Sequence, residues 1–407
     1  MHLQLSSLLS MLPLVLAIPT AKRSEPAPLL VPRGEAFTLI PDEYIVKLKK
    51  GSASAALEDA IKIIPGDANH VFESIFRGFT GKLDSSTLEA LRSHPDVDYV
   101  EQNAFYEAFG AVTQSQAPWG LARLSHLQPG SGDYVYDSSA GEGTCAYVVD
   151  SGLYAAHPDF EGRAEFLGSF IGDYNDNCLH GTHVAGTIGS RTFGVAKKTS
   201  IYGIKVLEYS AEARTCGSDN SIIMAGMEHV ARDAAGRSCP NGVVVNLSLG
   251  GGWSQSINDA AAALVRQGFF VAVAAGNGDR NHFPMDAAAV SPASEPSVCT
   301  VGSVDSDDRT ARDSNYGDLV DIHAPGVDVV STRVGGGYLA MSGTSMATPH
   351  ITGLGAYFLG LGVASASDMC SFLQYNALQD YIGNLRGRTK NLLAQNGIGA
   401  WEQGLRE

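Results

Sequence analysis

Apolar and polar positions follow one pattern in the first hundred residues of the chain and a different pattern after them. Near the N-terminus, short stretches that alternate every second residue stand between stretches of helical period. Their order is strand, helix, paired strands, helix and strand, which predicts a small α+β unit of ferredoxin-like type. The expected elements are a strand in 42–51, a helix in 52–64, paired strands in 70–83, a helix in 84–95 and a strand in 97–103.

Beyond about residue 111 the apolar positions form longer unbroken runs. Such runs are typical of parallel strands that are covered on both faces. Segments with polar starts and helical period lie between them. The pattern predicts an α/β fold with a mostly parallel sheet flanked by helices. The runs are 145–150, 200–207, 242–250 and 269–277, and the clearest helical segments are 219–236 and 254–268.

Three polar residues stand at or just past the ends of these apolar runs, namely Asp150, Ser248 and Asn277. Open α/β sheets bind their ligands outside the carboxyl ends of the strands. We therefore expect these three residues at one edge of the sheet, where a site forms.

Composition narrows the class of protein. The chain has 407 residues, of which 44% are hydrophobic and 17% charged, which fits a folded globular protein with a large core. The formal net charge is −15. An acidic chain without a basic cluster repels phosphates, so nucleic acid is not an expected partner.

The N-terminus resembles a secretory signal peptide. Residues 1–20 hold a short apolar run that ends in small residues. This run is too short to span a bilayer comfortably, and no later run is long enough, so we expect a secreted, extracellular protein with no membrane partner. Residues 22–40 are rich in proline and charge and are expected to form a linker.

The six cysteines all lie between residues 145 and 370. An even number of cysteines in an exported protein favours disulfides, and no C-x-x-C pair supports a metal site. Six cysteines allow 15 pairings, and spacing alone does not choose among them.

The stretch SGTSMATPH, residues 342–350, places Ser345 in front of an apolar run that predicts a buried helix. Free N–H groups in the first turn of a helix stabilise a negative charge beside the serine hydroxyl. Pro349 is expected in this first turn, where its missing N–H is tolerated. Taken alone, Ser345 is more readily explained as an ordinary helix cap.

A serine nucleophile needs a base and an orienting carboxylate. His180 and His183 stand three residues apart at the start of another helical segment, and either could be a general base. They could also bind a metal or simply pack, although no glutamate completes an H-E-x-x-H motif. Asp150 follows an apolar strand and could orient the base, while a lone aspartate there is more often a turn former.

The order Asp150, His180, Ser345 is that of subtilisin-type hydrolases, and no G-x-S-x-G motif carries Ser345. Five motifs then make the resemblance specific: VVDSG, HGTHVAGTIGS, VNLSLGGG, AVAAGNG and SGTSMATPH. Across residues 111–407 the chain resembles the subtilisin-like serine peptidases, and APWGLARLSH and SPASEPSVCTVG resemble the proteinase K branch.

The resemblance implies a role for each matching residue. Ser345 would be the nucleophile, His180 the general base and then acid, and Asp150 its orienting partner. Asn277 would donate its amide to the oxyanion beside the backbone N–H of Ser345. His183 would be structural. The implied activity is a serine endopeptidase that acts through an acyl-enzyme intermediate and prefers apolar or aromatic side chains.

The resemblance also implies where a peptide or protein substrate would lie. It would pair as an extra strand with Ser248, Leu249 and Gly250. The side chain before the cut would enter a pocket lined by Ala274, Ala275 and Gly276. The opposite edge, residues 210–220, and the longer segment 281–290 depart from the family pattern and could reshape the cleft.

Three disulfides and a calcium site are implied in the same way. Cys145–Cys239 and Cys299–Cys370 follow the branch, and Cys178–Cys216 would tie the catalytic helix to the cleft wall. Structural calcium would be bound by the carbonyl groups of Pro296 and Val298 and by the carboxylate of Asp321. Asn246 begins a formal glycosylation sequon, which we discount because it lies in a predicted core strand.

The small α+β unit resembles the inhibitory propeptide of the family. We expect a signal peptide in 1–20, a propeptide in 21–110 and a peptidase domain in 111–407, with self-cleavage near residues 110–111. The propeptide would inhibit its own enzyme, and the mature enzyme would be a monomer.

Two rival interpretations remain at this point. An aspartic protease would need a second D-[ST]-G triplet besides the one at Asp150, and none occurs. An inactive exported binding protein with a protease fold would be free to lose catalytic residues, yet Asp150, His180, Asn277 and Ser345 are all present.

Overall fold

The structure is a computed structural model that describes residues 25–31, 38–105, 111–212 and 215–398. The chain divides into two compact units, residues 1–108 and 109–407, and each is described by itself. The expected signal peptide lies outside the described residues, as does most of the expected propeptide tail at 105–110.

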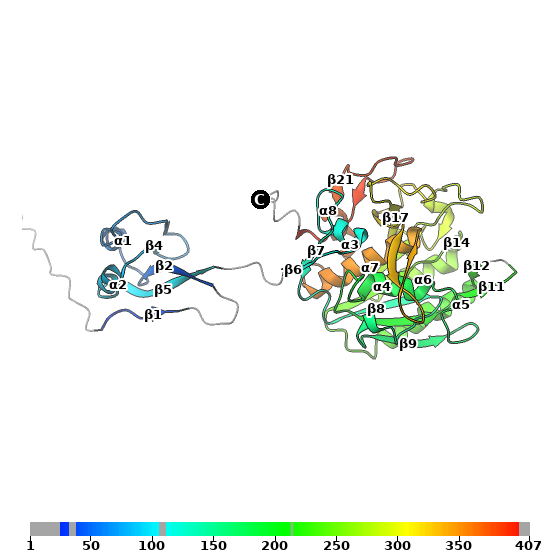
Figure 1. Ribbon diagram of the computed structural model, residues 1–407, viewed down its shortest axis with the longest axis horizontal. Helices are drawn as coiled ribbons and strands as arrows, with labels where there is room; N and C mark the ends of the chain where they lie inside the picture. The colour runs from blue at the N-terminus through cyan, green and yellow to red at the C-terminus, as the bar shows by residue number, and fades with distance from the viewer. Residues whose placement is uncertain (1–24, 32–37, 106–110, 213–214, 399–407) are drawn as a thin grey trace, which may run out of the picture. The chain divides into compact units, whose positions relative to one another are not determined.

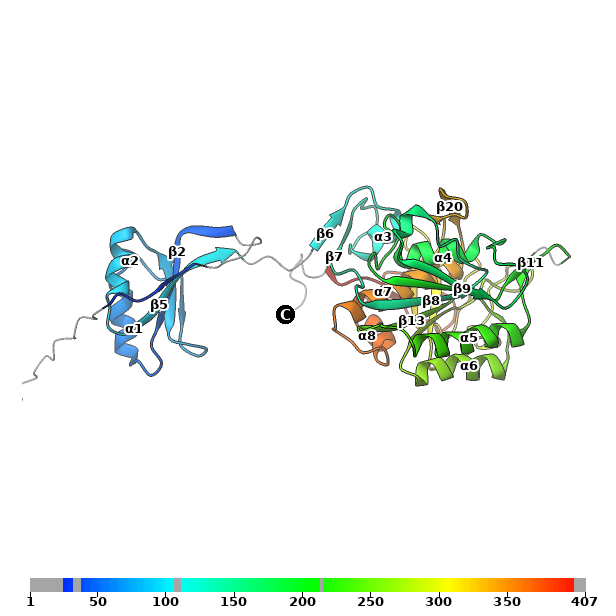
Figure 2. The same cartoon turned by 90° about the horizontal axis from the view of Figure 1, so that it is seen from below.

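The smaller unit is a five-stranded sheet in the order β1-β5-β2-β4-β3, with two helices packed on one face (Figure 2). Leu57 of the first helix and Leu88 and Leu91 of the second pack on apolar strand residues such as Phe79 and Val100. The predicted order of elements is confirmed. Their bounds are β1 Leu29–Leu30, β2 Thr38–Leu48, α1 Ser54–Ile61, β3 His70–Phe72, β4 Gly78–Lys82, α2 Ser85–Arg92 and β5 Val97–Phe105.

The expected linker at 22–40 is partly wrong. Leu29 and Leu30 pair in parallel with Val100 and Glu101 of β5, and Ala27 is fully buried. The backbone N–H of Ala27 donates to the carbonyl of Arg92 at 2.7 Å. Backbone pairing along a free sheet edge outweighs the local signal of the prolines, because it needs no particular side chains.

The larger unit is built on a nine-stranded sheet in the order β21-β22-β18-β17-β15-β13-β8-β10-β9. Its neighbouring strands are parallel except for the short pair β21 and β22, as predicted for a mostly parallel sheet. The bounds are β8 Thr144–Asp150, β9 Ala164–Ser169, β10 Ser200–Lys205, β13 Gly242–Leu247, β15 Phe270–Ala274, β17 Cys299–Val304, β18 Ile322–Pro325, β21 Leu378–Gln379 and β22 Leu392–Leu393.

Helices cover both faces of this sheet (Figures 1 and 2). Ala146 and Val148 of β8 face the core that contains α4 and α7, whereas Tyr147 and Val149 face the core that contains α5 and α6. This alternation explains why the strand is apolar along its whole length. The helices are α3 Trp119–Leu124, α4 His180–Gly189, α5 Asn220–Ala234, α6 Gln255–Arg266, α7 Thr344–Gly360 and α8 Met369–Asn376, with 3-10 turns η1 Pro158–Phe160 and η2 Ala287–Ala289.

Four two-stranded antiparallel sheets complete the larger unit. Two of them, β11 with β12 and β14 with β16, lie at the edges of the cleft described below. The pairs are β6 Ala111–Gln114 with β7 Tyr134–Asp137, β11 Glu208–Ser210 with β12 Thr215–Gly217, β14 Gly251–Gly252 with β16 Val290–Ser291, and β19 Val329–Thr332 with β20 Tyr338–Met341. Among the described residues, no helix is long and apolar enough to cross a membrane.

Candidate active site

Asp150 and His180 form a hydrogen-bonded pair at the carboxyl end of β8. Asp150 is the last residue of this central strand and is fully buried, and His180 is the first residue of α4. The distance between Asp150 Oδ1 and His180 Nδ1 is 2.7 Å. A carboxylate accepts here, so Nδ1 carries the proton and Nε2 of the neutral ring is left with a free lone pair.

Two residues that the sequence analysis did not single out set the position of His180. Ser151 Oγ accepts a hydrogen bond from Gly181 N at 2.9 Å and donates to Asp176 Oδ1 at 2.7 Å. The other oxygen of Asp176 accepts from Thr182 N at 2.8 Å. The first turn of α4 is therefore capped by side chains from outside the helix, which fixes where the helix begins.

Gly181 allows α4 to approach the end of β8 closely. A Cβ atom at this position would lie 2.1 Å from the carbonyl oxygen of Gly152. Since no Cβ atom tolerates that distance, glycine is required at position 181 for the helix to bring His180 against Asp150.

Two opposing effects act on the pKa of His180. Burial disfavours the imidazolium and lowers the pKa, while the charge and the hydrogen bond of Asp150 raise it. The carboxylate outweighs burial, and the pKa lies above the ordinary value of 6.5. Asp150 therefore stabilises the protonated form of the His180 ring, the form that a general base adopts during a reaction.

Ser345 lies in the first turn of α7 and exchanges hydrogen bonds with Ser248. Ser345 Oγ donates to the carbonyl of Ser248 at 3.1 Å, and Ser248 Oγ donates to the carbonyl of Ser345 at 2.8 Å. The Ser345 hydroxyl proton therefore points to the end of β13 rather than to His180. Hydrogen bonds between a nucleophile and its base often form well only when substrate is bound.

The expectation for Pro349 is wrong in one respect. α7 begins at Thr344, so Pro349 lies in the second turn rather than the first. In a regular helix the N–H at this position would bond to the carbonyl of Ser345. Proline has no N–H, so that carbonyl is free to accept from Ser248 Oγ, which locks the start of α7 to the sheet.

Asn277 faces the same helix start. Its Oδ1 accepts hydrogen bonds from Thr344 N at 2.8 Å and from Thr344 Oγ1 at 2.9 Å. Within the described part of the chain, neither Asn277 Nδ2 nor the backbone N–H of Ser345 has an acceptor. The arrangement thus presents two donors without partners, as an oxyanion site requires.

His180, Ser345 and Asn277 line one cleft with a volume of about 800 Å³. Ser248, Leu249 and Gly250 form part of its wall, and so do Ala274 and Gly276. Ala275 is placed differently. It is fully buried in the core on the α5 and α6 side of the sheet, and its carbonyl accepts from Asn315 Nδ2 at 2.8 Å.

The cleft also contains charged residues that the sequence analysis missed. Asp279 and Arg280 line it together with Met285, all three in the loop that follows Asn277. Asn315 Oδ1 holds the base of this loop by accepting from Gly278 N at 3.0 Å and from Met285 N at 2.8 Å. The rim of the cleft therefore carries charge, although the walls at 248–250 and 274–276 do not.

The structure pairs the six cysteines in the way that the resemblance implies. The disulfides are Cys145–Cys239, Cys178–Cys216 and Cys299–Cys370. Cys178 and Cys216 both line the cleft, so their bond joins the segment before α4 to strand β12 on the opposite edge.

His183 and Asn246 have structural surroundings. His183 is fully buried, and its Nε2 donates to the carbonyls of Val329 at 2.9 Å and Leu339 at 3.0 Å, which ties α4 to the β19–β20 hairpin. Burial lowers the pKa of His183 to about 4, so the ring stays neutral. Asn246 is fully buried within β13 and bonds to Ser248 Oγ and Thr352 Oγ1 at 2.9 and 2.8 Å, so its side chain is not accessible for glycosylation.

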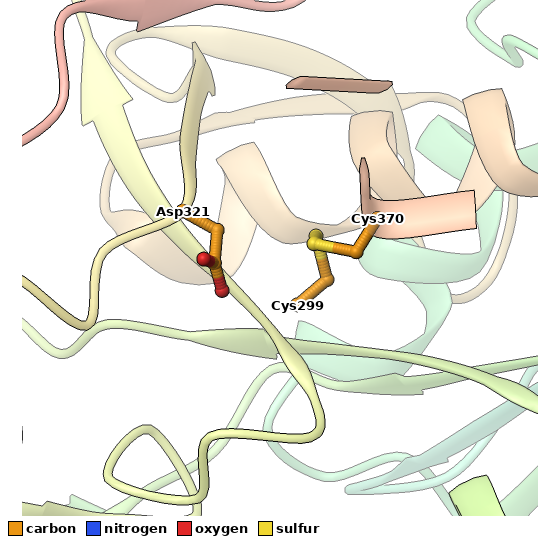
Figure 3. Close-up of side chains that lie close together, drawn as sticks. All are labelled: Cys299, Asp321 and Cys370. Carbon is orange, nitrogen blue, oxygen red and sulfur yellow. A yellow bond between two sulfur atoms is a disulfide. The ribbon is translucent and has the colours of Figure 1, made fainter. Parts of the chain in front are cut away.

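Asp321 is the charged member of the expected calcium site. Its Oδ2 accepts from Thr300 N at 3.0 Å, so the carboxylate faces the segment that follows Val298. Figure 3 shows it beside Cys299 and Cys370, but these cysteines form a disulfide and offer no thiolate to a metal. A carboxylate together with main-chain carbonyls suits Ca²⁺, and Asp321 Oδ1 already contacts the ammonium of Lys390 at 2.8 Å.

A buried aspartate bonded to a histidine, a serine at a helix start and two free donors, all at the carboxyl edge of a parallel sheet, define a serine hydrolase of the Asp-His-Ser class. The chain belongs to the subtilase family: the model of that family matches residues 141–382, and the model described as peptidase inhibitor I9 matches residues 43–109.

Relatives at high identity agree with this assignment. The chain is 50% identical to Proteinase R of Parengyodontium album over 398 residues, which cover 97% of this chain and 99% of the relative. It is 48% identical to a cuticle-degrading protease of Metarhizium anisopliae, over 97% of this chain and all of the relative. The crystal structure of a cold adapted subtilisin-like serine proteinase is similar with a TM-score of 0.63, at 36% identity, covering 69% of this chain and 99% of that chain.

The chain is therefore a subtilisin-like serine protease of the proteinase K branch. Its smaller unit matches an inhibitor family that serves as a propeptide, so the full chain is a zymogen. The proposals that the chain is an aspartic protease or an inactive binding protein receive no support from these relatives, which are named as proteinases.

Proposed function

We propose that the mature enzyme is a secreted endopeptidase in which Ser345 is the nucleophile, His180 the general base and Asp150 its orienting partner. The observation that carries this proposal is the 2.7 Å contact between His180 Nδ1 and Asp150 Oδ1, on a histidine that lines the same cleft as Ser345. That contact sets the tautomer in which Nε2 can take the serine proton.

The reaction then runs in two stages. Ser345 Oγ releases its hydrogen bond to Ser248, gives its proton to His180 Nε2 and attacks the substrate carbonyl carbon. The developing oxyanion is bound by Asn277 Nδ2 and by the backbone N–H of Ser345. His180 passes the proton to the leaving amine, and an acyl-enzyme remains on Ser345. Water then gives a proton to His180 Nε2 and attacks the acyl carbonyl, and the bond to Ser345 Oγ breaks as His180 returns the proton to that oxygen.

The substrate binds as an additional strand along Ser248, Leu249 and Gly250. The side chain before the cut enters the space beside Ala274 and Gly276, where the small residues leave room for apolar or aromatic groups. The reciprocal bonds between Ser248 and Ser345 support this register, because they hold the substrate strand's partner beside the nucleophile.

We further propose the boundaries 1–20 for the signal peptide, 21–110 for the propeptide and 111–407 for the peptidase, with a monomeric mature enzyme. The inhibitor family matches residues 43–109, which supports a cut just after that match. Export is supported by the apolar N-terminal run and by three disulfides, which persist in oxidising compartments.

Structural calcium is part of the proposal. Pro296 and Val298 would supply carbonyl oxygens and Asp321 its carboxylate, and the ion would hold the start of β17 without taking part in the reaction.

A covalent serine probe tests the proposed nucleophile. A sulfonyl fluoride should label the mature enzyme on the peptide that contains Ser345, and hydrolysis of denatured casein should stop as labelling completes. Label on another serine, or full activity after complete labelling of Ser345, would overturn the assignment.

A further inference from the structure

A short segment near the C-terminus lies against the segment that carries Asp321. Thr389 Oγ1 accepts a hydrogen bond from Gly317 N at 2.9 Å, and Arg388 forms an ion pair with Asp318. Lys390 follows directly and contacts Asp321. Arg388 and Thr389 are thus joined to the residues before Asp321, which holds the backbone of Lys390 beside that segment.

The Lys390 ammonium has two partners, and both belong to the surroundings of the expected calcium site. Its Nζ donates to Asp321 Oδ1 at 2.8 Å and to Gln374 Oε1 at 3.4 Å. Gln374 lies on α8, one turn after Cys370. The disulfide of Cys370 lies beside Asp321. The Asp321 side chain is 17% exposed, whereas that of Lys390 is 41% exposed, so the lysine can leave while the carboxylate stays in place.

We propose that Lys390 is a built-in cation that competes with calcium for Asp321. The inference rests on the calcium site of the proposed function and adds a residue that regulates its occupancy. In the absence of calcium the ammonium neutralises Asp321, and calcium binds only as the ammonium withdraws toward solvent.

Charge determines the direction of this effect. Calcium affinity depends on the number of charged ligands, and this site offers a single carboxylate. An ammonium beside that carboxylate repels the doubly charged ion and occupies one of its ligand oxygens. Lys390 therefore weakens calcium binding, and when calcium is scarce it ties Asp321 to Gln374 of α8.

Calorimetric titration of calcium into the mature enzyme tests this. The enzyme is first inactivated with a sulfonyl fluoride to prevent self-digestion, and the wild type is compared with Lys390→Met, Lys390→Arg, Asp321→Asn and the double variant Lys390→Met/Asp321→Asn. We expect Lys390→Met to bind calcium roughly tenfold more tightly than the wild type, since it loses the competing charge. Lys390→Arg keeps the charge and should stay near the wild-type affinity. The double variant should lose the gain, which assigns the effect to Asp321.

Different failures have different meanings. If the wild type and Lys390→Met bind calcium with equal affinity, and Asp321→Asn does not bind it, the competition is overturned but the calcium site stands. A gain that persists in the double variant would place the ion elsewhere and overturn the inference. No calcium binding by Lys390→Met at 10 mM would overturn both the inference and the calcium site. Labelling of Ser345 by the inhibitor reports separately on the proposed catalytic function and on folding.

Discussion

In the proposed mechanism, the side chain of Asn277 is oriented before substrate arrives. Two hydrogen bonds from Thr344 fix its Oδ1, at 2.8 and 2.9 Å, so its Nδ2 is oriented by the helix that carries Ser345. A donor that is already oriented stabilises the transition state more than the ground state, because the charge develops only there.

Asn277→Ala should therefore lower kcat by about 10²–10³ and change KM little. Steady-state kinetics on a chromogenic peptide measure both constants. Asn281→Ala, in the exposed part of the same loop, is the matched control and should leave both near wild type. If Asn277→Ala changed KM instead of kcat, Asn277 would be a substrate-binding residue rather than an oxyanion donor.

The Asp150–His180 pair predicts the acid side of the pH profile. His180 accepts a proton only when neutral, so kcat/KM of the free enzyme should fall as pH drops through its pKa, which Asp150 holds above 6.5. Asp150→Asn removes the charge while burial continues to lower the pKa, so the acid limb should move to lower pH. The same change should reduce kcat by about 10⁴ through loss of the correct tautomer. An acid limb that stays in place in Asp150→Asn would show that another group controls it.

The residues of the proposed catalytic mechanism could be named from the sequence, whereas the residues that position them could not. Asp150, His180, Asn277 and Ser345 stand in motifs that identify them by residue type and order. The contributions of Ser151, Asp176 and Thr344 depend on hydrogen-bond geometry at helix starts, which residue type alone does not fix.

At the scale of elements, the disulfide Cys178–Cys216 joins the start of the catalytic helix to strand β12. It closes a loop with a sequence separation of 38 residues. Replacing both cysteines with alanine should lower the free energy of unfolding by about 2–4 kcal/mol, mainly because the unfolded chain gains freedom. It should also raise KM for long peptides more than for short ones, since β12 borders the cleft.

Urea unfolding of the inhibited enzyme and kinetics with peptides of two lengths measure these effects. The Cys145–Cys239 pair, replaced in the same way, is the matched control, because neither cysteine lines the cleft. This replacement should lower the free energy of unfolding without raising KM more for long peptides than for short ones. An equal effect on KM from both replacements would contradict a role for Cys178–Cys216 at the cleft.

Helices and strands with a strong apolar pattern were predicted well. The wrong predictions fall where the local sequence pattern is weak. The apolar runs at 145–150 and 242–250 became β8 and β13, since burial on both faces leaves an unmistakable pattern. β1 was missed because two residues paired on a sheet edge carry no periodicity. Pro349 was predicted in the first turn of α7 but lies in the second. The start of this helix depends on hydrogen bonds with Ser248, which is far from it in the sequence.

At the scale of the whole molecule, three buried histidines predict sensitivity to acid. Burial lowers the pKa of His183, His323 and His350 to about 4. Between pH 4 and 6.5 the unfolded chain binds protons that the folded chain does not, so stability present above pH 6.5 is lost as pH falls. Each histidine contributes roughly 1.4 kcal/mol per pH unit in this window. His180 acts in the opposite direction, because its pKa is raised.

Urea unfolding of the inhibited mature enzyme at pH 7 and pH 5 should therefore show a loss of several kcal/mol at pH 5. His323→Gln should flatten this dependence, while His282→Gln, which changes an exposed side chain, should leave it unchanged. Equal stability at the two pH values would mean that the buried histidines are protonated in the folded enzyme.

Ser345 should hydrolyse peptide bonds, beginning with the chain's own propeptide. The most direct test is the intact mass of the secreted product from the wild-type chain and from Ser345→Ala, each expressed with its signal peptide. The wild-type product should begin near residue 111, and the variant should retain its propeptide. Ser345→Ala that matures to the same mass and still digests denatured protein would contradict this role of Ser345.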